Sequence, residues 1–146
     1  MVSDKRNQLL LVEDSEDDAF LFQWSFDKTQ SPFALHRVRN GAEAIDFLRA
    51  ASNSDALPRL IFLDLKMPVV NGFDVLVWLQ KQSFPLPMPV VVISGSAQEE
   101  GEDMARYLGA TDYLVKPVAI ADIRRHLNLI SSPCNQPMAE GSRAQT

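Results

Sequence analysis

Cysteine is nearly absent from this sequence of 146 residues, which contains only Cys134. A single cysteine excludes an internal disulfide and a cysteine-rich zinc site. Long hydrophobic runs are missing too, because the N-terminal region offers only the short run "LLLV" at 9–12. Such a run is too short for a signal peptide or a membrane span. We therefore expect a cytoplasmic protein with no membrane partner.

The sequence also lacks an excess of positive charge and any loop that would cradle a nucleotide. Its formal net charge is −5 at pH 7, whereas nucleic-acid-binding domains usually carry a basic face. Neither G-x-x-x-x-G-K-[ST] nor G-x-G-x-x-G occurs. We expect no nucleic-acid partner and no bound nucleotide, and a weakly acidic surface favours solubility or a basic protein partner.

Five short, mainly apolar runs are present, and stretches long enough for helices separate them. The runs are "LLLV" (9–12), "LHRV" (35–38), "LIFL" (60–63), "VVVI" (90–93) and "YLV" (113–115). Continuous hydrophobicity is typical of strands that are buried on both faces. The alternation predicts an α/β fold, a flavodoxin-like five-stranded parallel sheet in the order 2-1-3-4-5 with helices on both faces. Residues 1–130 should form one domain and 131–146 a flexible tail.

Helical periodicity predicts which side chains face the core. In the first helix, with Ser15 as N-cap, Phe22 and Phe26 share one face, whereas Phe20 and Trp24 point elsewhere. Those two aromatics either form an interface, for a partner or a homodimer, or are covered by loops. The core-facing sets predicted for two later helices are Phe73, Leu76, Val77 and Leu79, and Met104, Tyr107 and Leu108. His126, beside Arg124 and Arg125, is predicted on a solvated face.

Polar residues follow all five apolar runs directly. They are Glu13 and Asp14 after the first, Asp64 after the third, Ser94 after the fourth and Lys116 after the fifth, while Arg39 and Asn40 after the second are less informative. In open α/β sheets, ligands bind beyond the carboxyl ends of the strands. We therefore expect these side chains to meet in one crevice.

Three carboxylates in one crevice repel one another unless a cation is present. Glu13, Asp14 and Asp64 offer the hard oxygen ligands that Mg²⁺ prefers, and such sites leave room for phosphate oxygens. Ser94 can donate a hydrogen bond to a phosphate oxygen, and Lys116 supplies a positive charge. Without a nucleotide loop, the phosphoryl group is expected on the protein itself, as an aspartyl phosphate. Asp17 and Asp18 are interpreted as helix-start acids that favour the helix dipole rather than as metal ligands.

These fragments resemble a response-regulator receiver domain over roughly residues 7–130. The similarity rests on "LLLVEDSEDD", "VRNGAEAIDFL", "LIFLDLKMPVVNG", "PVVVISGSA" and "GATDYLVKPV", in that order. The resemblance implies that Asp64 accepts a phosphoryl group from a phosphohistidine on a sensor histidine kinase. The sequence is most similar to stand-alone receivers that serve phytochrome-type kinases. This resemblance implies that the signal passes through an unknown downstream protein.

The resemblance also implies roles for individual residues. Glu13, Asp14 and Asp64, with the backbone carbonyl of Lys66, would hold Mg²⁺. Ser94 and Lys116 would contact the phosphoryl group, Tyr113 would act with Ser94 as the switch, and the Lys116–Pro117 bond would be cis. Such a protein is no enzyme beyond its own phosphotransfer and dephosphorylation.

Two other functions fit the same predicted fold. One is an interaction module that is never phosphorylated, against which the set Asp14, Asp64, Ser94 and Lys116 argues. The other is a phosphatase with an aspartyl nucleophile, which generally has a second acid two positions later and a capping insertion. Lys66 occupies that position here, and no connection is long enough for a cap.

Overall fold

The structure is a computed structural model that describes residues 7–54, 56–67, 70–84, 88–95 and 99–131. Its strands are β1 (Gln8–Val12), β2 (Ala34–Val38), β3 (Ile61–Asp64), β4 (Val90–Ser94) and β5 (Asp112–Val115). Its helices are α1 (Glu16–Lys28), α2 (Gly41–Asn53), α3 (Gly72–Gln80), α4 (Glu99–Tyr107) and α5 (Ile120–Ser131).

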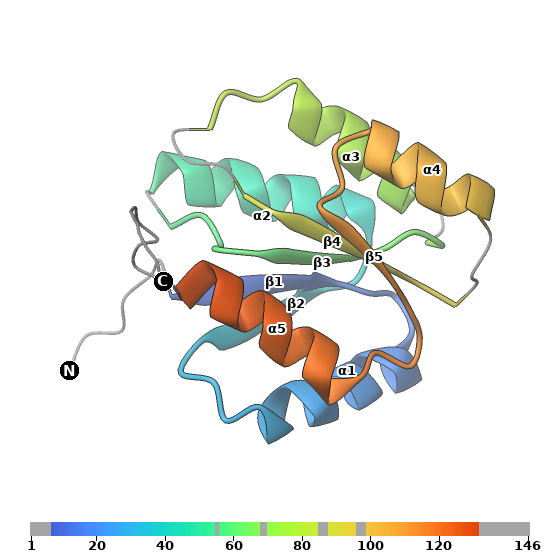
Figure 1. Cartoon of the computed structure of the whole chain (residues 1–146). Helices are drawn as coiled ribbons and strands as arrows, with labels where there is room; N and C mark the ends of the chain where they lie inside the picture. The colour runs from blue at the N-terminus through green and yellow to red at the C-terminus, as the bar shows by residue number, and fades with distance from the viewer. Residues whose placement is uncertain (1–6, 55, 68–69, 85–87, 96–98, 132–146) are drawn as a thin grey trace, which may run out of the picture.

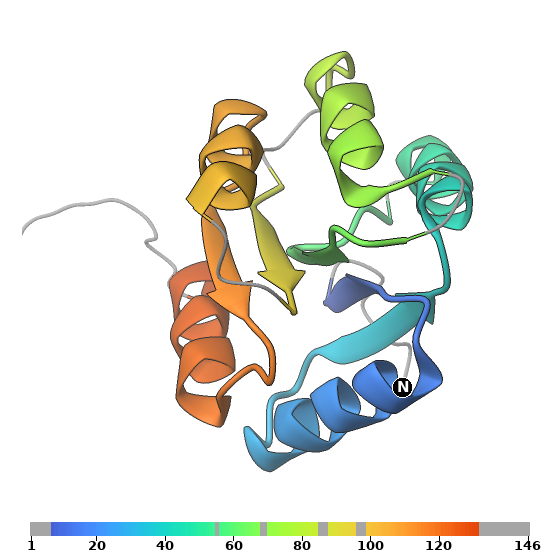
Figure 2. The ribbon, with the colours of Figure 1, turned by 90° about the vertical axis from the view of Figure 1, so that its right-hand side faces the viewer.

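The five strands form one parallel sheet in the order β2-β1-β3-β4-β5. Helices α1 and α5 cover one face of the sheet, and α2, α3 and α4 cover the other (Figure 1; Figure 2). The fold predicted from the apolar runs is confirmed. Because all strands run the same way, their carboxyl ends meet at one edge, and the polar residues that follow the strands gather there.

The hydrophobic core has two halves, one on each face of the sheet. In β1, the side chains of Leu9 and Leu11 pack with Phe22 and Phe26 on the α1 and α5 side. Leu10 and Val12 pack on the opposite side, against residues of α2 and α3. This alternation within a continuous apolar strand follows from the pleat, which directs successive side chains to opposite faces.

Helix α1 begins as predicted. The Ser15 hydroxyl accepts a hydrogen bond from the backbone N–H of Asp18 at 3.2 Å, so Ser15 is the N-cap. Phe22 and Phe26 are buried, whereas Phe20 is 70% exposed and Trp24 50% exposed. The alternative in which loops cover these two aromatics is therefore wrong, and their role as an interface stays a prediction.

The predicted core faces of α3 and α4 are partly wrong. Val77 is exposed, and the buried valine of α3 is Val75. In α4, Met104 is 49% exposed and Tyr107 81% exposed, while Ala105 is fully buried. A short helix close to a sheet places a small side chain at the contact, so the large apolar residues do not mark the buried face.

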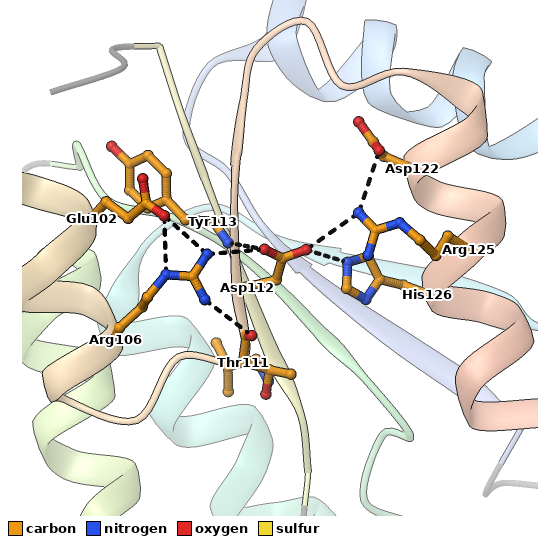
Figure 3. A network of polar contacts seen from close by, with 9 residues as sticks. Glu102, Arg106, Thr111, Asp112, Tyr113, Asp122, Arg125 and His126 are labelled. Carbon is orange, nitrogen blue, oxygen red and sulfur yellow. Dashed lines mark hydrogen bonds and ion pairs between the residues drawn. The ribbon is translucent and has the colours of Figure 1, made fainter. Parts of the chain in front are cut away.

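The prediction of a solvated His126 is wrong as well. Its side chain is buried, and its Nε2 lies 2.8 Å from Oδ2 of Asp112, the first residue of β5. Asp112 also pairs with Arg106 of α4 at 3.2 Å and with Arg125 of α5 at 3.3 Å (Figure 3). We call Asp112, Arg106, Arg125 and His126 the Asp112 network. It joins two helices that flank the edge strand β5.

The predicted flexible tail at 131–146 lies outside the described ranges except for Ser131, which is the last residue of α5. Cys134 is likewise among the residues that are not described. Over the ranges that are described, none of the helices is both long enough and apolar enough to cross a membrane.

Candidate functional site

The carboxyl ends of β1 and β3 bring three acids together. Glu13 follows β1 and Asp64 ends β3, and their side chains are 1% and 3% exposed. Asp14 is exposed next to them, and one oxygen from each of the three side chains lies within 4.8 Å of the others. We call Glu13, Asp14 and Asp64 the acidic cluster, and its assembly is the one that the strand-end argument predicted.

The chain around Asp64 is held by close packing of α3. A side chain at Gly72 would come within 2.7 Å of the Asp64 carbonyl oxygen, so only glycine permits this approach. The backbone N–H of Lys66 donates to Asp64 Oδ1 at 3.3 Å, while the Lys66 side chain is exposed. The role of the Lys66 carbonyl as a metal ligand stays a prediction.

The loop after β1 is held in place by hydrogen bonds. The backbone N–H of Ser15 donates to Glu13 Oε2 at 3.2 Å, which turns this carboxylate toward the start of α1. Arg37 of β2 donates through Nε to the Glu13 carbonyl oxygen at 2.9 Å. Arg37 was not predicted from the sequence, because a charged residue inside a strand gives no sign that its side chain reaches a neighbouring loop.

Lys116 provides the positive charge of the site, from the end of β5. Its ammonium lies 2.8 Å from Glu13 Oε1, 2.8 Å from Asp18 Oδ2 and 3.6 Å from Asp64 Oδ1. Its backbone N–H donates to the carbonyl oxygen of Ser94 at 2.7 Å. The predicted cis peptide bond between Lys116 and Pro117 is confirmed. The lysine therefore lies among the acids as expected, with Asp18 as a partner that was not expected.

The protonation equilibria of the site follow from burial and crowding. Burial, followed by the charge of Glu13, raises the pKa of Asp64 to about 7, although Lys116 acts in the opposite direction. Burial would lower the pKa of the Lys116 ammonium, but hydrogen bonds to Asp18 and Glu13 outweigh it and raise that pKa. The Lys116 ammonium therefore stays charged, but its single positive charge cannot neutralise all the carboxylates around it.

Ser94 and Tyr113 lie where the resemblance implies. Ser94 ends β4 and is 3% exposed, and it pairs in register with Val115 of β5. Tyr113 is buried in the core half under α4, and a side chain at Gly101 of α4 would lie 3.4 Å from its hydroxyl oxygen. The Tyr113 ring therefore already lies in the hydrophobic core in this structure. Its movement together with Ser94 stays a prediction.

The acidic cluster fits a divalent cation. Glu13 Oε1 is fully buried, and it shares the Lys116 ammonium with Asp18 and Asp64. Buried carboxylates are costly unless cations bind them, and one ammonium cannot compensate all of these acids. Carboxylate oxygens on a solvent-open site match the coordination of Mg²⁺.

A cavity of about 550 Å³ opens beside the acidic cluster, between α1 and the connection from β5 to α5. Glu13, Asp18 and Lys116 lie at its polar end, and Leu21 and Trp24 of α1 line its apolar part. The half-exposed Trp24 is thus close to the charged site, so a partner that covers α1 would also approach Lys116.

The fold and the site together define an α/β protein with an acidic crevice at the carboxyl ends of its strands, and comparison with known families identifies the family. The response regulator receiver domain family matches residues 9–128, so the chain belongs to that family. It is a receiver domain of two-component signalling. Receiver domains bind Mg²⁺ at an acidic pocket, interact with histidine kinases and generally signal rather than act as enzymes.

Three relatives show how far this similarity extends. The probable methanogenesis regulatory protein FilR2 of Methanothrix harundinacea is 31% identical over 118 residues, covering 80% of this chain and 76% of that protein. The bacteriophytochrome response regulator AtBRR is 28% identical, with a TM-score of 0.74 and coverage of 86% and 93%. The phosphorylated cyanobacterial phytochrome response regulator RcpA is 27% identical, with a TM-score of 0.72 and coverage of 88% and 96%.

Proposed function

We propose that Asp64 of this receiver domain accepts a phosphoryl group from a phosphohistidine of a sensor histidine kinase. The observation that supports this most is the placement of Asp64, which is buried at 3% exposure beside Glu13 and Asp14, with the Lys116 ammonium 3.6 Å from its Oδ1. A carboxylate is a nucleophile that can form a covalent phosphoryl intermediate.

The transfer forms one bond and breaks one. A carboxylate oxygen of Asp64 supplies the electron pair of a new P–O bond, while the P–N bond of the phosphohistidine breaks and the imidazole nitrogen keeps its electron pair. Lys116 and Ser94 bind the transferred phosphoryl oxygens. Mg²⁺ held by Glu13, Asp14, Asp64 and the Lys66 carbonyl would neutralise charge on those oxygens.

The signal then passes to other proteins. We infer that Ser94 and Tyr113 shift when Asp64 is phosphorylated, and that this changes a surface for an unknown downstream protein. Phe20 and Trp24, exposed on α1, are the aromatic residues most suited to a partner or to a homodimer. Similarity to phytochrome response regulators supports a phytochrome-type kinase as the donor, and we place the protein in the cytoplasm.

Intact mass after incubation with Mg²⁺ and acetyl phosphate tests the proposal. Transfer moves the phosphoryl group from the acyl oxygen of the donor to Asp64 and releases acetate. We expect the addition of one phosphoryl group to the parent chain and none to Asp64→Asn, since an amide is no nucleophile here. The matched control, Asp17→Asn, removes an exposed acid of α1 and should be phosphorylated like the parent.

The same assay separates the alternatives. A parent chain that gains no phosphoryl group would indicate an interaction module that works without phosphorylation. Continuous hydrolysis of the donor, at a rate far above the slow turnover of one bound group, would indicate a phosphatase with Asp64 as nucleophile. Either result would overturn the proposed function.

A further inference from the structure

Asp18 contacts the Lys116 ammonium although it lies outside the acidic cluster. Its Oδ2 is 2.8 Å from the ammonium, the same distance as Glu13 Oε1, whereas Asp64 Oδ1 is 3.6 Å away. The contact joins residues that are 98 positions apart, from the first turn of α1 to the end of β5. A helix-start acid that served the helix dipole alone would not need to reach this lysine.

Hydrogen bonds hold the backbone of Asp18 in place independently of its contact with Lys116. Its backbone N–H donates to the hydroxyl oxygen of the N-cap Ser15 at 3.2 Å. The backbone N–H of Ser15 in turn donates to Glu13 Oε2 at 3.2 Å. The side chain therefore starts from a rigid turn that is tied to the acidic cluster. It is partly shielded from water, with 39% of the side chain exposed against 18% for Lys116.

An ammonium has three N–H donors, and it can share its charge among only a few close oxygens. The two short contacts direct Lys116 toward Glu13 and Asp18 and leave Asp64 beyond hydrogen-bond distance. A phosphoryl group on Asp64 would place new charged oxygens near this ammonium. With two of its three donors directed at Glu13 and Asp18, the ammonium can turn more than one N–H toward those oxygens only by weakening one of these two contacts.

We propose that Asp18 is a positioning residue that holds Lys116 away from Asp64 in the unphosphorylated chain and so weakens binding of a phosphoryl group at Asp64. The inference rests on the proposed phosphorylation of Asp64. An interaction that is stronger in one of two states shifts the equilibrium toward that state. Loss of the Asp18 charge therefore favours the state in which a phosphoryl group, or its mimic, occupies Asp64.

Beryllium trifluoride, a tetrahedral mimic of the phosphoryl group, gives an equilibrium readout. We would titrate it at saturating Mg²⁺ and follow the increase in melting temperature, since a ligand that binds the native state stabilises it. Asp18→Asn should bind the mimic about twofold to fivefold more tightly than the parent, the range expected for a partly exposed ion pair. Loss of a residue that only supports the fold would leave the affinity unchanged or lower it.

Two variants control for charge and for folding. Asp17→Asn removes the same charge from the same helical turn, and among the described residues no cation lies within ion-pair distance of Asp17. The affinity of this variant for the mimic should therefore stay within about twofold of the parent. Asp18→Glu keeps the charge and should return the affinity toward the parent value. If Asp18→Asn does not fold, Asp18→Ser removes the same charge and is measured in its place.

The outcomes separate this inference from the proposed function. Failure of the parent to bind the mimic and to gain a phosphoryl group would overturn both. If the parent does both, an unchanged or weaker affinity in the Asp18 variants would overturn the role of Asp18 alone. An equal gain in Asp17→Asn would do so as well, because general charge would then explain the effect.

Discussion

The acidic cluster and the Asp112 network solve opposite electrostatic problems in one small protein. In the cluster, Glu13, Asp14 and Asp64 lie together, and two of them, Glu13 and Asp64, share the Lys116 ammonium with Asp18. In the network, one carboxylate contacts Arg106, Arg125 and His126. The first region has too few cations for its acids, whereas the second is balanced, because Arg106 also pairs with Glu102 and Arg125 with Asp122.

The pKa values of the two central aspartates follow this difference. Burial and the charge of Glu13 raise the pKa of Asp64 to about 7. Burial would also raise the pKa of Asp112, but hydrogen bonds from the Tyr113 N–H and from His126 outweigh it and lower that pKa. Charge of one sign that is concentrated without compensation marks a binding site, whereas compensated charge marks a structural contact.

Removal of Lys116 should have the largest effect on stability. Lys116→Met leaves Glu13 buried without a cation, so we expect a loss of about 2 to 3 kcal/mol in chelator. This is less than for a fully buried pair, because 18% of the lysine side chain is exposed. Urea unfolding of both proteins measures the difference, and a Lys116→Met chain as stable as the parent would show that the acids do not depend on this cation.

Asp112→Asn should also destabilise the protein, by about 1 to 3 kcal/mol at pH 7. The amide leaves Arg106, Arg125 and the buried His126 without their shared negative charge. Because the folded-state pKa of Asp112 lies below its ordinary value of 3.8, its contribution is present above that pH and is lost as the pH falls below it. Urea unfolding at pH 7 and at pH 3 to 4 should therefore show a difference that shrinks in acid.

Asp64→Asn should have the opposite sign and stabilise the protein in chelator, on the order of 1 kcal/mol. The folded-state pKa of Asp64 is raised from 3.8 to about 7. The folded parent therefore holds a proton that the unfolded chain has lost between these values, and the stability of the parent falls as the pH rises through this window. The advantage of the variant should be small near pH 4 and reach its maximum above pH 7.

Mg²⁺ provides the control for that measurement, because it should stabilise the parent more than Asp64→Asn. A variant that is less stable than the parent in chelator at pH 8 would show that Asp64 makes structural hydrogen bonds. Asp64 would then be a structural residue like Asp112, and not part of a binding site.

The smallest expected effect comes from a single cation of the Asp112 network. Arg125→Gln removes contacts to Asp112 and Asp122, but its side chain is 51% exposed, and Arg106 and His126 remain. We expect a loss of about 0.5 kcal/mol, measured by thermal unfolding at low and high salt. A loss above about 2 kcal/mol would mean that the network is not redundant.

The sequence made the fold and most of the acidic cluster predictable. Strands that are buried on both faces have continuous apolar runs, and the parallel order brings their carboxyl ends together. Glu13, Asp14, Asp64, Ser94 and Lys116 all come directly after such runs or at their last position. Their meeting is therefore a consequence of strand order alone.

The contacts that were missed depend on how helices pack, which strand order does not determine. Asp18 suits a helix start in any protein, and its contact with Lys116 depends on the position of α1 beside the end of β5. His126 stands beside two arginines in the sequence, and only the packing of α5 against Asp112 explains why it is buried. In α4 the small Ala105, not Met104 or Tyr107, lies against the sheet.

The central claim is that the acidic cluster serves a phosphoryl group on Asp64, and reductive trapping tests it most directly. Borohydride delivers one hydride to the carbonyl carbon of an acyl phosphate, which releases phosphate and leaves an aldehyde. A second hydride and a proton convert the aldehyde into an alcohol, so a phosphorylated aspartate becomes homoserine. After reaction with acetyl phosphate and Mg²⁺, followed by borohydride and peptide mass mapping, we predict homoserine at position 64 in the parent chain. Homoserine at another acid, or a phosphoryl group that survives borohydride on a different residue, would contradict the account.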